Sequence, residues 1–199
     1  IRDSSVTGVQ TCALPISQFW VRYRGTSFSC YFGDEMTIRG IYDISFRLPP
    51  VPVSGTYEIR MYECTLAGSG HCDRGVVQLY LNGDPCGIPV DLRLDLTDPR
   101  VGGIPDDELE TEERISANDK AMRNRGYMKS SDAILTYEGI SHRNKPGLAR
   151  RILTTGYFYA EQDYYVRMKL VLDNPKAEMT IDYMEWVPKS IYDYNEDRH

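Results

Sequence analysis

The chain has 199 residues, of which 41% are hydrophobic and 26% charged, and its formal net charge is −6. A length of this order indicates one domain, or one domain with an insertion, that can bury a hydrophobic core. The acidic balance argues against a surface for nucleic acid or anionic membranes, because both need basic patches. No apolar run is long enough to span a bilayer.

The first segment, residues 1–17, reads IRDSSVTGVQTCALPIS and resembles a translated sequencing-adapter sequence. This resemblance implies that the segment is not native, so we set it aside from the fold prediction; a real N-terminal arm is the alternative. It also implies that the native start is missing and that the chain is the C-terminal part of a longer protein. Without Cys12, four native cysteines remain.

Strand patterns begin directly after this segment. Residues 18–29 alternate in polarity and predict an opening strand that carries Trp20, and MTI at 36–38 enters the next strand. Residues 42–48 alternate strictly, so one set of side chains is expected to face the core. That set is Tyr42, Ile44, Phe46 and Leu48.

A proline-rich break at 49–55 separates this strand from two more. Residues 57–61 alternate again, whereas VVQLYL at 76–81 is nearly continuous in apolar residues. A continuous run is expected of a strand covered on both faces. Asn-Gly-Asp-Pro at 82–85 then predicts a turn.

Two cysteines, Cys64 and Cys72, flank a glycine-rich loop between predicted strands. Facing strand ends can meet disulfide geometry, so we predict a disulfide between them. Unpaired thiols stay open as an alternative, as does a zinc site with the adjacent His71, although the spacing fits no zinc motif. Cys30 and Cys86 are interpreted as buried small hydrophobic residues.

The strand pattern stops between about residues 98 and 150. Residues 106–125 predict the one helix, because a proline stands at its start, acidic residues crowd its first half and basic residues its end. Its apolar stripe is thin, so the helix is expected to lie on the sandwich with its acidic run in solvent. Residues 127–151 are polar and predict a surface loop with an exposed His142.

Three further strand patterns cover residues 152–159, 164–172 and 178–187, and residues 191–199 are expected to form a flexible tail. Short strands with one helical insertion, and without strand–helix alternation, predict a single all-β domain over residues 18–190. The predicted fold is an antiparallel β-sandwich, and the strand order suggests a jelly roll.

Several segments resemble known families. SGTYEIRM, GVVQLYLNGDPCG, YYVRMKLVL and TIDYMEWV occur in an order similar to that of the galactose-binding-like β-sandwich of carbohydrate-binding modules. More closely, RLPPVPVSGTYEIR, ANDKAMRNRGYMK and DYMEWVPKSIYD resemble the C-terminal region of fasciclin-associated surface lipoproteins of Gram-negative anaerobes. That family has no assigned activity. The resemblance implies an extracytoplasmic protein at the cell surface or in the periplasm, held to the outer membrane by a lipid on the missing part.

Sugars are recognised by aromatic faces, with carboxylate, amide and guanidinium groups that fix the hydroxyls. The end of the predicted helix combines all these groups, so we predict a ligand site there, with Trp20 as a separate sugar-stacking residue. The alternatives are a salt-bridged helix end that docks on the sheet, and a tryptophan that only packs. The predicted ligand residues are Asn118, Asp119, Arg123, Asn124, Arg125, Tyr127 and Trp20.

The resemblance to carbohydrate-binding modules also implies a structural calcium ion. Asp182 matches the terminal-strand aspartate that can bind it there, and Asp34 and Glu35 are its expected partners. Hard carboxylate oxygens suit calcium, although the sequence around Asp34 departs from the usual pattern of the modules. The alternative is that Asp182 is a polar residue on the face of a strand.

Catalytic motifs are missing from the sequence: it contains no G-x-S-x-G, no H-E-x-x-H and no phosphate-binding glycine loop. Many acids are present, but none is marked as a glycosidase pair. We therefore expect a non-catalytic cell-surface module that binds glycan or extracellular matrix. A structural or adhesion domain that contacts a protein is the alternative, and a glycoside hydrolase or its accessory domain is a lesser one.

Overall fold

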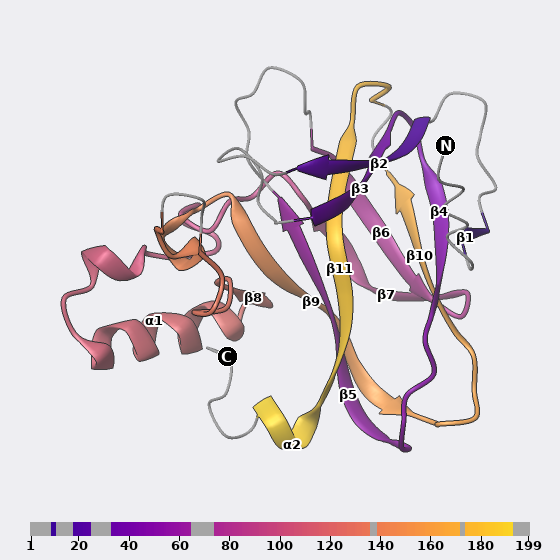
Figure 1. The fold of residues 1–199 in the computed structure, drawn as a ribbon. Coiled ribbons are helices and arrows are strands. Elements are labelled where there is room, and N and C mark those ends of the chain that lie inside the picture. Colours follow the sequence, from indigo (N-terminus) through magenta and orange to yellow (C-terminus); the bar gives the residue numbers. More distant parts are fainter. Residues whose placement is uncertain are drawn as a thin grey trace.

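The structure is a computed structural model that describes residues 9–10, 18–24, 33–64, 74–135, 139–171 and 174–192. Within these residues, two antiparallel sheets pack face to face (Figure 1). The predicted all-β sandwich is therefore confirmed.

The first sheet has the strand order β1-β4-β10-β6-β7. Its strands are β1 (Val9–Gln10), β4 (Asp43–Leu48), β6 (Val76–Leu81), β7 (Asp84–Asp91) and β10 (Tyr164–Leu170). The second sheet has the order β2-β3-β11-β5-β9-β8. Its strands are β2 (Gln18–Arg24), β3 (Gly33–Arg39), β5 (Gly55–Cys64), β8 (Tyr127–Met128), β9 (Leu148–Phe158) and β11 (Glu178–Pro188). The chain crosses between the sheets from β3 to β4 to β5 to β6 and from β9 to β10 to β11, as in a jelly roll.

The core lies between the two sheets. The alternation of β4 places Ile44, Phe46 and Leu48 inside, as predicted, and Tyr42 just before the strand is buried with them. Each apolar side chain of this size that is removed from water contributes roughly 1.5–3 kcal/mol. Strand β1 comes from the segment that resembles adapter sequence and pairs with β4, with Val9 opposite Phe46. The foreign origin of that segment stays a prediction.

Strands β6 and β7 differ from the prediction. The second sheet covers only one face of β6, so Gln78 and Tyr80 on the other face are half-buried, and the expected cover on both faces is wrong. The sequence prediction has no strand at β7, because this stretch contains Pro85 and Pro89, and a proline cannot donate a hydrogen bond to a neighbouring strand. Such residues are tolerated here because β7 is an edge strand that pairs with β6 alone.

The predicted helix 106–125 is two elements: the 3₁₀ turn η1 (Asp106–Glu108) and the helix α1 (Glu112–Arg123). The break falls at Glu110, whose φ of 59° lies in the left-handed region. Thr111 then caps α1 by accepting a hydrogen bond from the Arg114 backbone N–H (3.4 Å). Figure 1 shows α1 beside β8, outside the sandwich as expected.

The polar segment after α1 is not the surface loop that the sequence predicts. Lys129, Ser130 and Arg143 are buried, and His142 in the turn η2 (His142–Asn144) is only 1% exposed, so the expected exposure of this histidine is wrong. Burial is tolerated because the charged groups pair with one another and the Tyr62 hydroxyl contacts Ser130 Oγ (2.6 Å).

The described chain ends in a short helix, α2 (Lys189–Tyr192), and the rest of the predicted tail lies outside the described residues. Among the residues that the structure describes, no helix combines the length and the apolar character needed to cross a membrane.

Candidate functional site

The sequence predicts a ligand site at the end of helix α1, but the polar side chains there form hydrogen bonds within the protein. The Asn118 amide accepts a hydrogen bond from the Ile104 backbone N–H (3.1 Å) and donates one to the Gly102 carbonyl (2.8 Å). Arg125 donates to the Val101 carbonyl (2.9 Å). These two predicted ligand residues therefore fasten α1 to the segment that precedes it.

Two more of the predicted residues dock α1 on the second sheet. The Arg123 guanidinium pairs with Glu58 on β5 (2.5 Å), and the same carboxylate accepts a hydrogen bond from Arg60 (2.8 Å). Tyr127 is buried, with the Arg151 guanidinium carbon 4.1 Å from its ring centroid. Both side chains make the contacts of a helix end that is packed on a sheet.

The remaining two residues belong to the helix and to a buried ion network. Asn124 is the C-cap of α1. Asp119 pairs with Arg143 (2.6 Å) and lies 3.5 Å from Lys129 Nζ, which itself pairs with Asp106 (2.8 Å). Although burial opposes it, hydrogen bonds from Arg143 and Lys129 hold the pKa of Asp106 below its usual value. The ligand-binding role of the six residues stays a prediction, and their observed contacts are internal.

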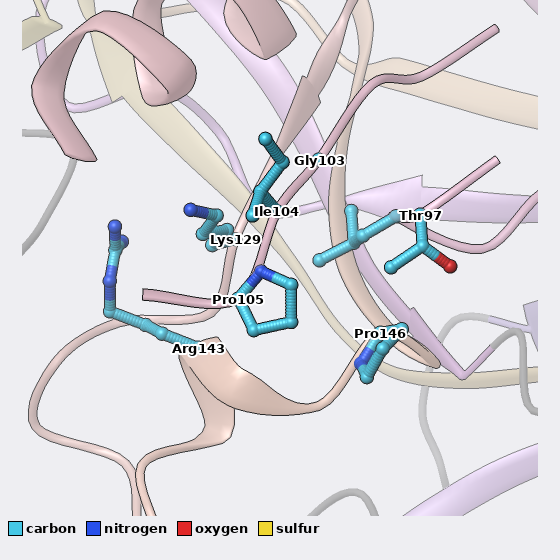
Figure 2. A pocket seen from close by; sticks show the side chains of 8 residues that line it. Thr97, Gly103, Ile104, Pro105, Lys129, Arg143 and Pro146 are labelled. Carbon is cyan, nitrogen blue, oxygen red and sulfur yellow. The ribbon is translucent and has the colours of Figure 1, made fainter. Parts of the chain in front are cut away.

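A small hollow of about 160 Å³ lies beside this network. Figure 2 shows that the charged ends of Lys129 and Arg143 lie on the side away from Thr97 and Pro146, so their stems line it. This volume includes open solvent, and the hollow encloses no space even for a single water molecule. The hollow is therefore too small to hold a sugar, and its lining offers no cluster of polar groups to bind one.

Two members of the predicted calcium site do come together. Ile181 on β11 pairs with Met36 on β3, which brings the next residue, Asp182, beside Glu35. Burial, and then the nearby charge of Glu35, raise the pKa of Asp182 to about 6. The side chain of Asp34 lies outside the described part. Within the described residues, no three His, Cys, Asp or Glu side chains form a possible metal site, so calcium here stays a prediction.

The other predicted residues are placed only in part. Trp20 is half-buried on the edge strand β2, opposite Thr37. Cys72 and the side chain of Cys64 lie outside the described residues, so the disulfide stays a prediction. Cys86 is a free thiol and is half-buried, which agrees only partly with the expected burial.

Two exposed tyrosines stand at the end of β9. Tyr157 and Tyr159 are each 58% exposed, and their ring centroids lie 5.2 Å apart with an angle of 67° between the planes. Phe158 between them points into the core, so the alternation of the strand directs both tyrosines outward. We call residues 157–163 the tyrosine turn; it is the candidate functional site that the structure adds.

The tyrosine turn rests on a rigid aromatic base. Phe158 packs edge to face against Trp186 and Tyr164, with ring centroids 4.7 and 5.0 Å away. The Tyr164 hydroxyl accepts a hydrogen bond from the Tyr159 backbone N–H (2.8 Å), and the next N–H donates to Ser54 Oγ (2.9 Å). The exposed rings are therefore carried by a backbone held from below.

Polar residues follow the two rings along the chain. Glu161, Gln162 and Asp163 in the tyrosine turn are exposed. Asp163 pairs with Arg47 on β4 (2.8 Å), and its backbone carbonyl accepts a hydrogen bond from the Asn82 amide (3.3 Å). The turn thus combines two exposed aromatic rings with carboxylate and amide groups.

The sequence prediction does not include this site, although a signal was present. In GYFYAEQDYY, two tyrosines share the parity that faces solvent, at the point where the strand runs into a turn. A polar residue is the ordinary occupant of such a position. A pair of large aromatic side chains there indicates a binding surface.

No family model matches this chain, and no curated protein matches it. Among solved structures, it is similar to a Paenibacillus xanthan lyase, with 13% sequence identity and a TM-score of 0.47. The match covers 88% of this chain and 12% of that one. A likeness this distant carries no argument about function, and the fold rests on the strand topology given above.

Proposed function

We propose that this domain is a non-catalytic glycan-binding module, and that the tyrosine turn is its binding site. The observation that carries the proposal is the exposed pair Tyr157 and Tyr159 on a backbone fixed by hydrogen bonds and by the aromatic base. We further propose, from the family resemblance, that the module acts at the cell surface as part of a lipoprotein.

The chemistry of the turn supports this proposal. The C–H faces of a sugar ring stack on aromatic faces, and its hydroxyls need hydrogen-bond partners close by. Tyr157 and Tyr159 offer the faces, and Glu161 and Gln162 offer carboxylate and amide groups. Little ordering entropy is lost on binding, because the hydrogen bonds to Tyr164 and Ser54 already hold the backbone.

A hydrolytic role has weaker support. Glycoside hydrolysis needs two carboxyl groups that both reach the sugar, one of them with a raised pKa. Asp182 beside Glu35 meets this requirement in part, since its pKa is raised to about 6 by burial and by Glu35. Glu35, however, is 2% exposed and cannot meet a substrate without rearrangement. We therefore keep the non-catalytic proposal.

The test compares glycan binding of the wild type and the double variant Tyr157→Ala/Tyr159→Ala on a broad glycan array and then by titration calorimetry. We expect the double variant to lose about tenfold or more in affinity, which is about 1.4 kcal/mol or more. Its melting temperature should stay near that of the wild type, because both rings are more than half exposed.

The matched control is Tyr165→Ala, which removes another exposed tyrosine from the outer face of β10 and should leave binding unchanged. Trp20→Ala and Arg123→Ala test the sites predicted from sequence. If either of them abolishes binding while the double variant binds normally, the site is misplaced. If the wild type binds no glycan at all, the alternative of an adhesion domain that contacts a protein is favoured.

A further inference from the structure

The second half of strand β9 is an open edge of the second sheet. Strand β5 pairs with β9 on one side, whereas the short β8 pairs with it on the other side only at Arg150 and Arg151. One further backbone hydrogen bond, from the Ile152 N–H to the Gly126 carbonyl (2.9 Å), extends this cover by a residue. Within the described part of the chain, nothing pairs with the backbone of residues 153–158 on that side.

This edge lacks the features that keep other strands away. Exposed sheet edges usually carry prolines or charged residues, because these oppose pairing with a further strand. The end strands β7 and β2 follow this rule, since β7 contains Pro85 and Pro89 and β2 contains Arg22 and Arg24. Residues 152–159 read ILTTGYFY and contain neither a proline nor a charge. Their β-branched and aromatic side chains favour an added strand.

The side chains along the edge indicate which strand fits. A foreign peptide is selected by pockets or charges beside the edge, and residues 153–158 provide no charge. A second β9 in antiparallel orientation brings no like charges together. With a twofold axis at Gly156, Thr155 of one copy lies opposite Tyr157 of the other. Both side chains are exposed on the outer face of the sheet, and a pair of an aromatic and a β-branched residue across two strands is favourable.

We infer that two copies of this chain associate edge to edge, β9 against β9, and form one continuous sheet across a twofold axis. Backbone hydrogen bonds hold the two strands together, and the pairs of Thr155 with Tyr157 set their register. Only residues 154–158 of each copy take part, so the dimer is weak, with a dissociation constant of about 10 µM to 1 mM. This inference goes beyond the proposed function and does not depend on it.

Sedimentation velocity of the intact chain between about 10 µM and 1 mM tests the inference, with amide hydrogen exchange measured at both concentrations. We expect the dimer fraction to rise with concentration. Exchange of the amides of residues 153–158 should slow by at least about threefold at the upper concentration, because pairing protects the N–H groups that point away from β5.

Charge variants test the register and the identity of the partner. Thr155→Lys/Tyr157→Lys should stay monomeric, because like charges then lie opposite each other, and so should Thr155→Glu/Tyr157→Glu. An equimolar mixture of the two variants should form dimers again, since each lysine then faces a glutamate, and this result also shows that both variants fold. The matched control is Phe19→Lys/Val21→Lys, which adds the same charges to exposed positions on the opposite edge strand and should leave the dimer unchanged.

Three outcomes would overturn this inference. The first is a wild type that stays monomeric at about 1 mM, and the second is a dimer that persists in both charge variants of β9. The third is slower exchange of residues 153–158 only after an unrelated extended peptide is added, which would make another protein the partner. None of these outcomes bears on glycan binding by the tyrosine turn, which its own titration measures.

Discussion

The two ends of strand β9 use charged and aromatic side chains in opposite ways. At its start, β9 pairs with β8 and meets the insertion, residues 98–150. There the buried side chains of Arg143 and Lys129 pair with Asp119 and Asp106. At its end, the tyrosine turn leaves both tyrosines more than half exposed. The polar groups of the insertion make internal contacts, whereas the two tyrosine rings of the turn stay exposed to solvent.

This difference shows that composition alone does not tell which polar and aromatic groups stay available to a ligand. The end of α1 holds both signs of charge, amides and an aromatic ring, which is the mixture that sugars need, yet Arg123 pairs with Glu58 and Asn118 bonds to backbone. The tyrosine turn has fewer such groups. What distinguishes the turn is that the rings are exposed while the backbone beneath them is held.

The largest effect is expected from breaking the insertion. Arg143→Ala should destabilise the domain by about 3–5 kcal/mol, because it leaves Asp106 and Asp119 partly buried with one cation fewer. Urea denaturation followed by circular dichroism measures this change. Glycan binding by the folded fraction should not change, since the tyrosine turn lies at the other end of β9.

The matched control is Arg114→Gln in the same insertion. Arg114 pairs with Glu110 four residues earlier (3.0 Å), but both side chains are exposed, so the loss should be small. Equal destabilisation by the two variants would show that the network around Arg143 does not hold the insertion in place.

The sequence predicts the sandwich well and the insertion poorly, for a physical reason. Alternation in β4 reports burial directly, because the period of a strand fixes which side chains share a face. Polar residues carry no such period: Lys129 and His142 look like solvent-facing residues until their partners, distant in sequence, are known. The break at Glu110 depends on one left-handed residue, which local propensity does not indicate.

The candidate site was missed for a related reason. Whether Tyr157 and Tyr159 are core or surface depends on which face of β9 the first sheet covers, and that is a property of the assembled sandwich. Conversely, the resemblance that predicts a cation site names Glu35 and Asp182, and the fold does bring this pair together. Sequence reasoning therefore placed this pair together, and its calcium-binding role stays a prediction.

An intermediate effect is expected at Asp182, whose pKa is moved in the direction opposite to that of Asp106. Burial and Glu35 raise it to about 6, so the folded state binds a proton more tightly than the unfolded state. Stability then falls as the pH rises from about 4 to 6 and stays lower above it. Asp182→Asn should remove this penalty and stabilise the domain at pH 7 by about 1–2 kcal/mol, after allowance for the partial exposure of the carboxyl.

Thermal unfolding at pH 4.5 and pH 7, with chelator and with millimolar calcium, measures both this effect and the predicted ion. With chelator, the variant should gain more stability over the wild type at pH 7 than at pH 4.5. If calcium binds here, it should raise the melting temperature of the wild type and not that of the variant, because a ligand that binds only the folded state must stabilise it. A variant that is less stable than the wild type in chelator at pH 7 contradicts the raised pKa.

The smallest effect is expected at an exposed ion pair, Arg47 with Asp163, which contrasts with the buried ion pairs of the insertion. Arg47 and Asp163 lie 2.8 Å apart, a distance like that between Lys129 and Asp106, but both side chains of the first pair are about half exposed. Water solvates each charge when its partner is removed, so Arg47→Gln should move the melting temperature by no more than about 1 °C. A large loss of stability would mean that the tyrosine turn, like the insertion, depends on its charges for its shape, and the contrast between the two ends of β9 would no longer hold.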